Sequence, residues 1–233
     1  MKTLTVIQHT SADYLGLMED HLEGRGIRFI YCRPFTEGVE VPNTRSVLDG
    51  LILLGGGPWN TSGARALPTL REEVLLARDC LYSGKAVIGI GLGAQILALA
   101  ADGSVEQCPL TFVVDEARRV KDDALNGYMP ERFPLPVYMR DWPVPPSYAE
   151  ILAEDSQGRP AVFQIGDKAL GFAGHPGFKR AMAEDLIMEF EDGPDDPGDM
   201  LVRLGASKPQ IEDALVSIMT GVMQVTGLMK SGE

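Results

Sequence analysis

The stretch with the clearest chemical potential is the motif GIGLGAQ at residues 89–95. The apolar run before it, residues 86–90, predicts a buried parallel strand, and a helix is expected to begin near Ala94. Glycines on both sides of position 91 allow a sharp turn, which places residue 91 at the top of a sheet beside a helix N-terminus. Enzymes place nucleophiles on such turns, but Gly91 has no side chain that could attack a substrate.

A second glycine-rich turn follows another expected strand, residues 47–54. It consists of Gly55, Gly56 and Gly57, followed directly by Pro58 and Trp59. Backbone N–H groups in a turn of this kind, at the carboxyl end of a strand, can point at a ligand. Taken alone, this turn is only a weak indication of a binding site.

Together the two turns resemble the class I glutamine amidotransferases, whose nucleophile motif is Gly-x-Cys-x-Gly, then a small residue or histidine, then glutamine. Residues 89–95 match every fixed position except the cysteine, which is replaced by Gly91. The resemblance spans roughly residues 3–190 and implies that the glycine loop 55–57 faces position 91 as the oxyanion loop. It also implies a ligand pocket that includes Leu92, at the start of the helix, and Gln95, whose family counterpart contacts bound glutamine.

A second departure from the family lies near the end of the same region. There the family has a His-Pro-Glu segment that supplies the catalytic base and the carboxylate that orients it, whereas this chain reads His175-Pro176-Gly177. One missing residue could be an engineered change, but two at separate loci favour a lineage that has stopped this chemistry. We therefore expect no glutaminase activity, with His175 as a remnant and the nucleophile and glutamate positions vacant at Gly91 and Gly177.

Two classes of function follow from these residues. The first is a catalytically degenerate protein that binds a small ligand, glutamine-like or glutamate-like, or a synthetase or ligase partner, in a regulatory or scaffolding role. The alternative is an active enzyme of the superfamily that acts on a glutamine or γ-glutamyl substrate by altered chemistry; an engineered inactive enzyme also remains open. Arg140 replaces a His-containing family segment and could meet a carboxylate ligand, or it could be a solvated arginine paired with Asp141.

The composition of the chain argues against two classes of binding partner. A net charge of −12 without any basic stripe argues against nucleic acid and anionic membranes as partners. The N-terminus is expected to be a first strand and not a signal peptide, and no run is apolar enough to span a bilayer. Three cysteines without CxxC spacing indicate reduced thiols in a cytoplasm, and neither a metal site nor a cofactor is implied.

The alternation of expected strands and helices predicts an α/β fold, a doubly wound, mostly parallel sheet with a C-terminal helical extension. The expected boundaries are an amidotransferase-like domain at 1–190, an acidic linker at 191–206 and an amphipathic helix at 207–233. Because that helix carries a continuous apolar stripe that must be buried, we expect a homodimer with the helix in or beside the interface. Docking of the helix on its own domain is the alternative.

Several local features carry weaker expectations. Ser11 is expected to cap a helix over residues 12–23, and capping boxes are expected at Thr69 and Ser207. His9 follows the first strand, at the edge where open α/β sheets gather ligands, but a solvated loop histidine is the favoured interpretation. The prolines between 130 and 146 predict only short elements in that region.

Overall fold

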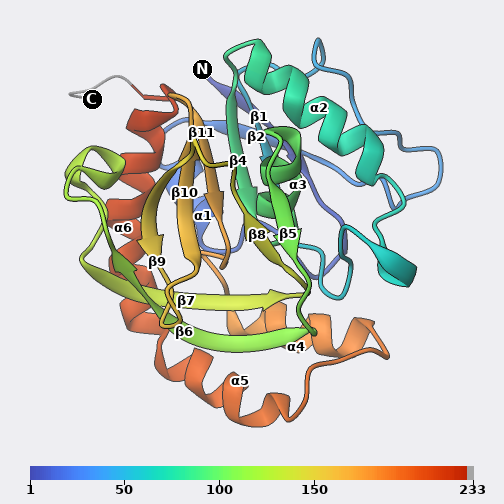
Figure 1. Cartoon of the computed structure of the whole chain (residues 1–233), viewed down its shortest axis with the longest axis vertical. Coiled ribbons are helices and arrows are strands. Elements are labelled where there is room, and N and C mark those ends of the chain that lie inside the picture. Colours follow the sequence, from blue (N-terminus) through green and yellow to red (C-terminus); the bar gives the residue numbers. More distant parts are fainter. Residues whose placement is uncertain (230–233) are drawn as a thin grey trace.

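The computed structural model describes residues 1–229, and a nine-stranded sheet runs through the middle of the molecule (Figure 1). The strand order is β2-β1-β3-β4-β11-β10-β9-β6-β7, parallel from β2 to β11 and antiparallel from β11 to β7. The strands are β1 (Thr3–Ile7), β2 (Arg28–Cys32), β3 (Gly50–Leu53), β4 (Ala86–Ile90), β6 (Thr111–Arg119), β7 (Arg132–Met139), β9 (Glu150–Glu154), β10 (Pro160–Ile165) and β11 (Ala169–Phe172). A separate antiparallel pair joins β5 (Ser104–Glu106) to β8 (Trp142–Val144).

Helices cover both faces of this sheet. They are α1 (Met18–Glu23), α2 (Leu70–Tyr82), α3 (Leu92–Ala100), α4 (Arg180–Glu189), α5 (Pro197–Ala206) and α6 (Lys208–Val225). Short 3-10 turns lie at Gly63–Arg65 and Ala124–Gly127. Within residues 1–229, none of the helices combines the length and the apolar character needed to cross a membrane.

The buried strands show why three layers form. In β3 and β4, Ile52 and Ile88 pack in one apolar cluster with α1 and α6, whereas Leu51 and Val87 pack in another with α2 and α3. Side chains alternate along a strand, so a strand that is apolar at every position buries both of its faces. This arrangement confirms the predicted α/β fold with helices on both sides of the sheet.

Strand β7 is longer than its sequence predicts. It runs for eight residues through Pro134 and Pro136, which pair with Glu116 and Val114 of β6. The expectation of short elements is wrong here because β7 is the outermost strand, where one side of the backbone needs no partner within the sheet. The β6–β7 hairpin crosses below the other strands, with α4 and α5 beneath it (Figure 1).

The expected acidic linker at 191–206 is wrong over its second part, because residues 197–206 form helix α5. Pro197 occupies the first turn, where the missing N–H needs no intrahelical partner. Leu204 is buried, and Met200 and Leu201 pack with it in a third apolar cluster that includes α4 and the β6–β7 hairpin. The short helix therefore belongs to the packed part of the chain. Within residues 191–206, only residues 191–196 lack regular structure.

Helix α6 buries its apolar stripe on its own chain. Leu215, Ile218, Met219, Val222 and Met223 all belong to the same core cluster as α1 and the central strands. The argument that the stripe requires a second subunit is therefore wrong, and the homodimer stays a prediction without that support. The helix ends at Val225, and residues 230–233 of the expected helix lie outside the described part of the chain.

The predicted helix caps are also wrong. Ser11 lies well before α1, which is a single short helix beginning at Met18. The hydroxyl of Thr69 donates a hydrogen bond to the Glu73 carboxylate over 2.6 Å and does not cap α2. Ser207 has a helical backbone and makes no side-chain cap, because it joins α5 directly to α6.

Candidate functional site

Gly91 joins β4 to α3 with φ +55° and ψ −114°, a conformation that residues with a side chain rarely adopt. Glycine is required at the flanking positions 89 and 93 because other backbone atoms lie too close for a side chain. A Cβ on Gly89 would lie 2.4 Å from the Gly93 carbonyl oxygen, and one on Gly93 would lie 2.0 Å from that of Leu53. A Cβ on residue 91 itself would meet only the Cα of Gly55, at 3.4 Å, which is an ordinary contact. The turn therefore keeps the shape of a nucleophile elbow, with room for the first atom of a side chain.

The glycine loop 55–57 follows β3 and faces this turn. A Cβ on Gly55 would lie 2.1 Å from Oδ2 of Asp13, and one on Gly57 would lie 3.1 Å from Leu186 and Phe190. Gly57 also has φ +57°, so the loop depends on glycine for both its conformation and its packing. Apart from chain neighbours, no described side chain, including that of Trp59, comes within 4 Å of a Cβ at position 91.

His175 follows β11 and is 5% exposed. Its Nε2 lies 2.8 Å from the Tyr14 carbonyl oxygen, and its Nδ1 accepts a hydrogen bond from the Gly177 N–H at 3.1 Å. Since a carbonyl oxygen can only accept and a backbone N–H can only donate, these partners fix the proton on Nε2. Burial lowers the pKa of His175 to about 4, so the ring is neutral at pH 7.

Gly177 lies against the backbone that precedes α1. A Cβ there would lie 2.9 Å from the Met18 nitrogen and 3.2 Å from that of Leu17, and the Gly177 carbonyl accepts the Leu17 N–H at 2.9 Å. On the other side of this contact, a Cβ on Gly16 would lie 2.2 Å from the Gly177 oxygen. Backbone of residues 16–18 thus occupies the space where a side chain at position 177 would begin.

Comparison with known proteins agrees with this geometry. No protein-family model matches the chain. A glutamine-hydrolysing GMP synthase of Aeropyrum pernix is 30% identical over 188 residues, covering 75% of this chain but only 35% of that protein. A putative glutamine amidotransferase-like protein of Salmonella typhimurium is 27% identical over 188 residues, covering 78% of each chain.

The solved structure of a glutamine amidotransferase from Thermotoga maritima superposes with a TM-score of 0.82 at 19% identity, over 97% of this chain and 98% of that one. The fold is thus shared over nearly the full length of both chains. The chain belongs to the class I glutamine amidotransferase family. It spans about a third of the length of the GMP synthase that it matches.

Two further residues of the predicted amidotransferase pocket are wholly buried. Leu92 packs over the glycine loop, where its Cδ2 would lie 2.4 Å from a Cβ on Gly56. Gln95 donates from Nε2 to the Arg140 carbonyl over 2.6 Å, while its Oε1 has no partner among the described residues. The Gln95 amide therefore ties helix α3 to the end of β7, and its buried Oε1 lacks a hydrogen-bond partner among the described residues.

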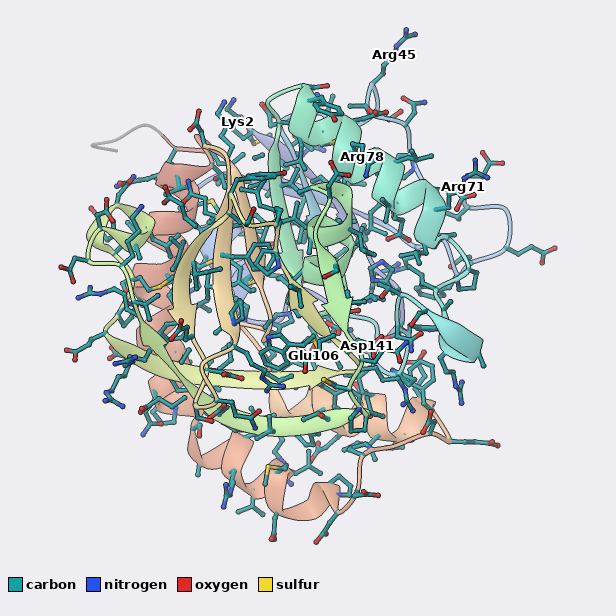
Figure 2. All side chains as sticks on the ribbon, in the orientation of Figure 1. Lys2, Arg45, Arg71, Arg78, Glu106 and Asp141 are labelled. Carbon is teal, nitrogen blue, oxygen red and sulfur yellow. The ribbon has the colours of Figure 1, made fainter. Side chains whose placement is uncertain are left out.

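Arg140 and Asp141 form the two-residue link between β7 and β8. Asp141 precedes Trp142, which pairs with Glu106 of β5, and Asp141 and Glu106 lie close together in Figure 2. Asp141 has φ +58°, a left-handed conformation that Asp tolerates better than most residues. The expected pair between these two residues does not form. Arg140 Nη2 donates instead to Asp192, and Asp141 Oδ1 accepts the Cys108 N–H at 3.1 Å. Both side chains line an open cavity of about 420 Å³.

The favoured interpretation of His9 as a solvated loop residue is wrong. His9 is 4% exposed, with Nδ1 3.0 Å from the Gly55 carbonyl oxygen and Nε2 2.7 Å from Oε2 of Glu73. Glu73, on α2, also accepts the Thr69 hydroxyl and is fully buried. Sequence analysis missed this pair because its partners lie 64 residues apart. The available signal was a histidine at the carboxyl end of a strand together with a glutamate on the inner face of an amphipathic helix.

The His9 and Glu73 side chains, with Asp13, form a buried ionisable cluster behind the glycine loop. Burial lowers the pKa of His9, but the Glu73 carboxylate and hydrogen bonds to Glu73 and Gly55 outweigh it, so the net shift is upward. Burial raises the pKa of Asp13 to about 7, against the opposing effect of His9. Within residues 1–229, no group of three or more His, Cys, Asp or Glu side chains is placed to hold a metal ion.

Proposed function

We propose that this chain is a catalytically inactive member of the amidotransferase family, which binds a small ligand at the carboxyl edge of its sheet and regulates or scaffolds a synthetase-type partner. The observation that carries the proposal is the bonding of His175. Both of its ring nitrogens are used by the backbone, at Tyr14 and Gly177.

Glutamine hydrolysis through a thioester needs a thiolate, an imidazole that can accept its proton and donors for the oxyanion. Gly91 supplies no thiol. The Nε2 of His175 already carries a proton that it donates to Tyr14, and its low pKa opposes further protonation. A glutamate side chain cannot be accommodated at position 177 without moving residues 16–18. Nucleophile, base and orienting carboxylate are thus each absent or engaged elsewhere.

The residues that the resemblance assigns to ligand binding support the proposal of a binding role. The elbow keeps its backbone shape, the glycine loop still faces it, and Gln95 has an unpartnered buried oxygen. Loss of a nucleophile removes a reaction step but not these groups. A small ligand of the glutamine or glutamate type therefore remains the best match to the edge of the sheet formed by β3, β4 and β11.

A partner protein is supported by the match to GMP synthase. This chain aligns with about a third of that glutamine-hydrolysing enzyme, so a related domain there is joined to a further two thirds of the protein. We infer a synthetase or ligase as the partner of this chain. A cytoplasmic location fits its three free cysteines, which form no disulfide within the described residues.

The decisive experiment compares ammonia release from glutamine by the natural protein and by G91C. We expect neither to exceed an inert control protein, because a thiol at 91 would lack a free base even though its Cβ has room. Removing catalytic residues of this kind costs several orders of magnitude in rate. Ammonia release that is abolished by H175A would overturn the proposal. Calorimetry with glutamine and glutamate tests the binding role separately.

A further inference from the structure

Two arginines from distant parts of the chain converge on one acidic side chain. Arg140, at the end of β7, contacts Oδ2 of Asp192 through Nη2, and Arg65, in the 3-10 turn after the glycine loop, lies 3.6 Å from the same oxygen through Nε. Asp192 lies in the short irregular segment between α4 and α5. Its carboxylate is about one third exposed, so it sits where solvent or a ligand can reach it.

The pairing is incomplete on the arginine side. Among the described residues, the buried Nε of Arg140 has no partner, although arginine binds carboxylates most strongly through two parallel N–H bonds. Both recorded arginine contacts also use one oxygen of Asp192, Oδ2. Asp192 therefore uses only part of the hydrogen-bonding capacity that the two guanidinium groups offer.

A polar cavity adjoins these groups. Its volume is about 420 Å³, and Arg65, Arg140, Asp141 and Cys108 contribute to its lining. Asp141 is 4% exposed, and its Oδ2 has no partner among the described residues while Oδ1 holds the Cys108 N–H. The residues that line the cavity thus include two arginines and an aspartate with one buried, unpartnered carboxylate oxygen. That combination matches a molecule carrying both a carboxylate and an ammonium group.

We propose that this cavity binds a free amino acid, whose carboxylate replaces Asp192 on Arg140 and Arg65 and whose ammonium group meets Asp141. The site does not use the vacant catalytic positions Gly91 and Gly177. The inference rests on the proposed function, because it assumes a chain that binds its ligand without converting it. Asp192 then acts as an internal stand-in for the ligand carboxylate.

Replacement of the Asp192 carboxylate by that of a ligand has a consequence for helix α5. Asp192 is held between α4 and α5, so a ligand that takes its place releases residues 191–196 from the arginines. A partly exposed ion pair contributes little free energy, so a small ligand can compete with it. Binding is therefore expected to loosen the segment that leads into α5, which would report the ligand to whatever contacts that helix.

The test measures affinity by calorimetry with L-glutamate, L-glutamine and succinate, which carries carboxylates but no amine. D192N is expected to bind the two amino acids about threefold more tightly than the natural protein, in line with the modest strength of exposed ion pairs. D195N is the matched control, because Asp195 is an exposed acid in the same segment. It should leave the affinity unchanged. Succinate should bind more weakly than L-glutamate, since it has no group for Asp141.

A second variant tests the arginine. R140K keeps the charge but loses the planar pair of donors, and it should weaken L-glutamate binding by about tenfold. Limited proteolysis within residues 191–196 of the natural protein should become faster when L-glutamate is added, and should already be fast in D192N. Circular dichroism confirms that each variant is folded.

The outcomes separate the two proposals. If L-glutamate binds but neither D192N nor R140K changes its affinity, the amino acid lies elsewhere, and this inference is overturned while the binding function stands. If no amino acid binds to the natural protein or to D192N, both the proposed small-ligand binding and the proposed site at Arg140 are wrong. Glutaminase activity in the natural protein would instead refute the inactive state and would not bear on Asp192.

Discussion

Two buried histidines, His9 and His175, differ in the groups that surround them. His175 lies between a backbone carbonyl and a backbone N–H, with no charged group among its hydrogen-bond partners. His9 lies between the Gly55 carbonyl and the Glu73 carboxylate, with Asp13 nearby. Burial acts in the same direction on both rings, but the pKa falls for His175 and rises for His9.

The difference shows that the partner atoms, and not the motif, decide what a histidine can do. His175, which the resemblance aligns with the family's catalytic base, is held in a neutral state by burial and by two backbone hydrogen bonds. The residue without a motif, His9, has a carboxylate partner, yet that pair is sealed inside the protein and supports the loop from behind. The glycine loop is thus supported by a buried ionisable pair, whereas His175 is held by the backbone alone.

The largest expected effect concerns the buried His9–Glu73 pair that supports the glycine loop. E73Q leaves His9 without its charged partner in a fully buried position, so the free energy of unfolding should fall by about 3–5 kcal/mol. Urea denaturation followed by circular dichroism measures the change. E72Q is the control, because Glu72 is exposed on the preceding position of α2 and should change stability little. Equal stability of the two variants would show that the buried pair contributes nothing.

A second prediction uses pH to isolate the contribution of the Asp13 carboxyl group to the free energy of unfolding. Burial raises the pKa of Asp13 from 3.8 to about 7, so the folded chain keeps this proton after the unfolded chain has lost it. Stability contributed by this group is therefore present below pH 4 and is lost as the pH rises towards 7, by up to about 4 kcal/mol.

D13N should remove that loss. As the pH rises from 4 to 8, D13N is expected to become more stable relative to the natural protein, as judged by the free energy of unfolding. His9 and Glu189, which act on Asp13, and the titrating His175 are present in both proteins. Denaturation midpoints across this range measure the trend, with the exposed D20N as the control. Parallel curves for D13N and the natural protein would contradict it.

The smallest effect is expected at Gly177, which the resemblance aligns with the family glutamate. G177E places a Cβ 2.9 Å from the Met18 nitrogen, and overpacking of this kind costs about 1–3 kcal/mol. G193E is the matched control, since no atom lies within 4 Å of a Cβ at Gly193. Thermal unfolding should show a lower midpoint for G177E only. Unchanged stability would mean that residues 16–18 move aside easily, and that the glutamate position is less closed than we infer.

Much of the fold follows from the sequence. Strand β4 has its predicted bounds, Ala86–Ile90, because an uninterrupted apolar run ended by glycine leaves few alternatives. The α/β architecture follows from the alternation of strands and helices along the chain. These features depend on residues that are close in sequence.

What could not be predicted depends on long-range contacts. The prolines of β7 are compatible with a strand only because β7 lies at the edge of the sheet, and α5 forms because α4 and a hairpin cover its apolar side. At the site, the pairing of His9 with Glu73 and of Arg140 with Asp192 joins residues 64 and 52 positions apart. Residue types identified the candidates, but only the tertiary structure assigns their partners.

The prolines of strand β7 have a consequence for association. An open sheet edge with free N–H groups can recruit a strand from another molecule, and proline lacks that donor. Pro134 and Pro136 interrupt the donors along this edge, and the Pro136 carbonyl is already taken by the His175 N–H. A partner that approaches β7 must therefore recognise side chains and cannot extend the sheet, which protects this side of the protein from edge-to-edge aggregation.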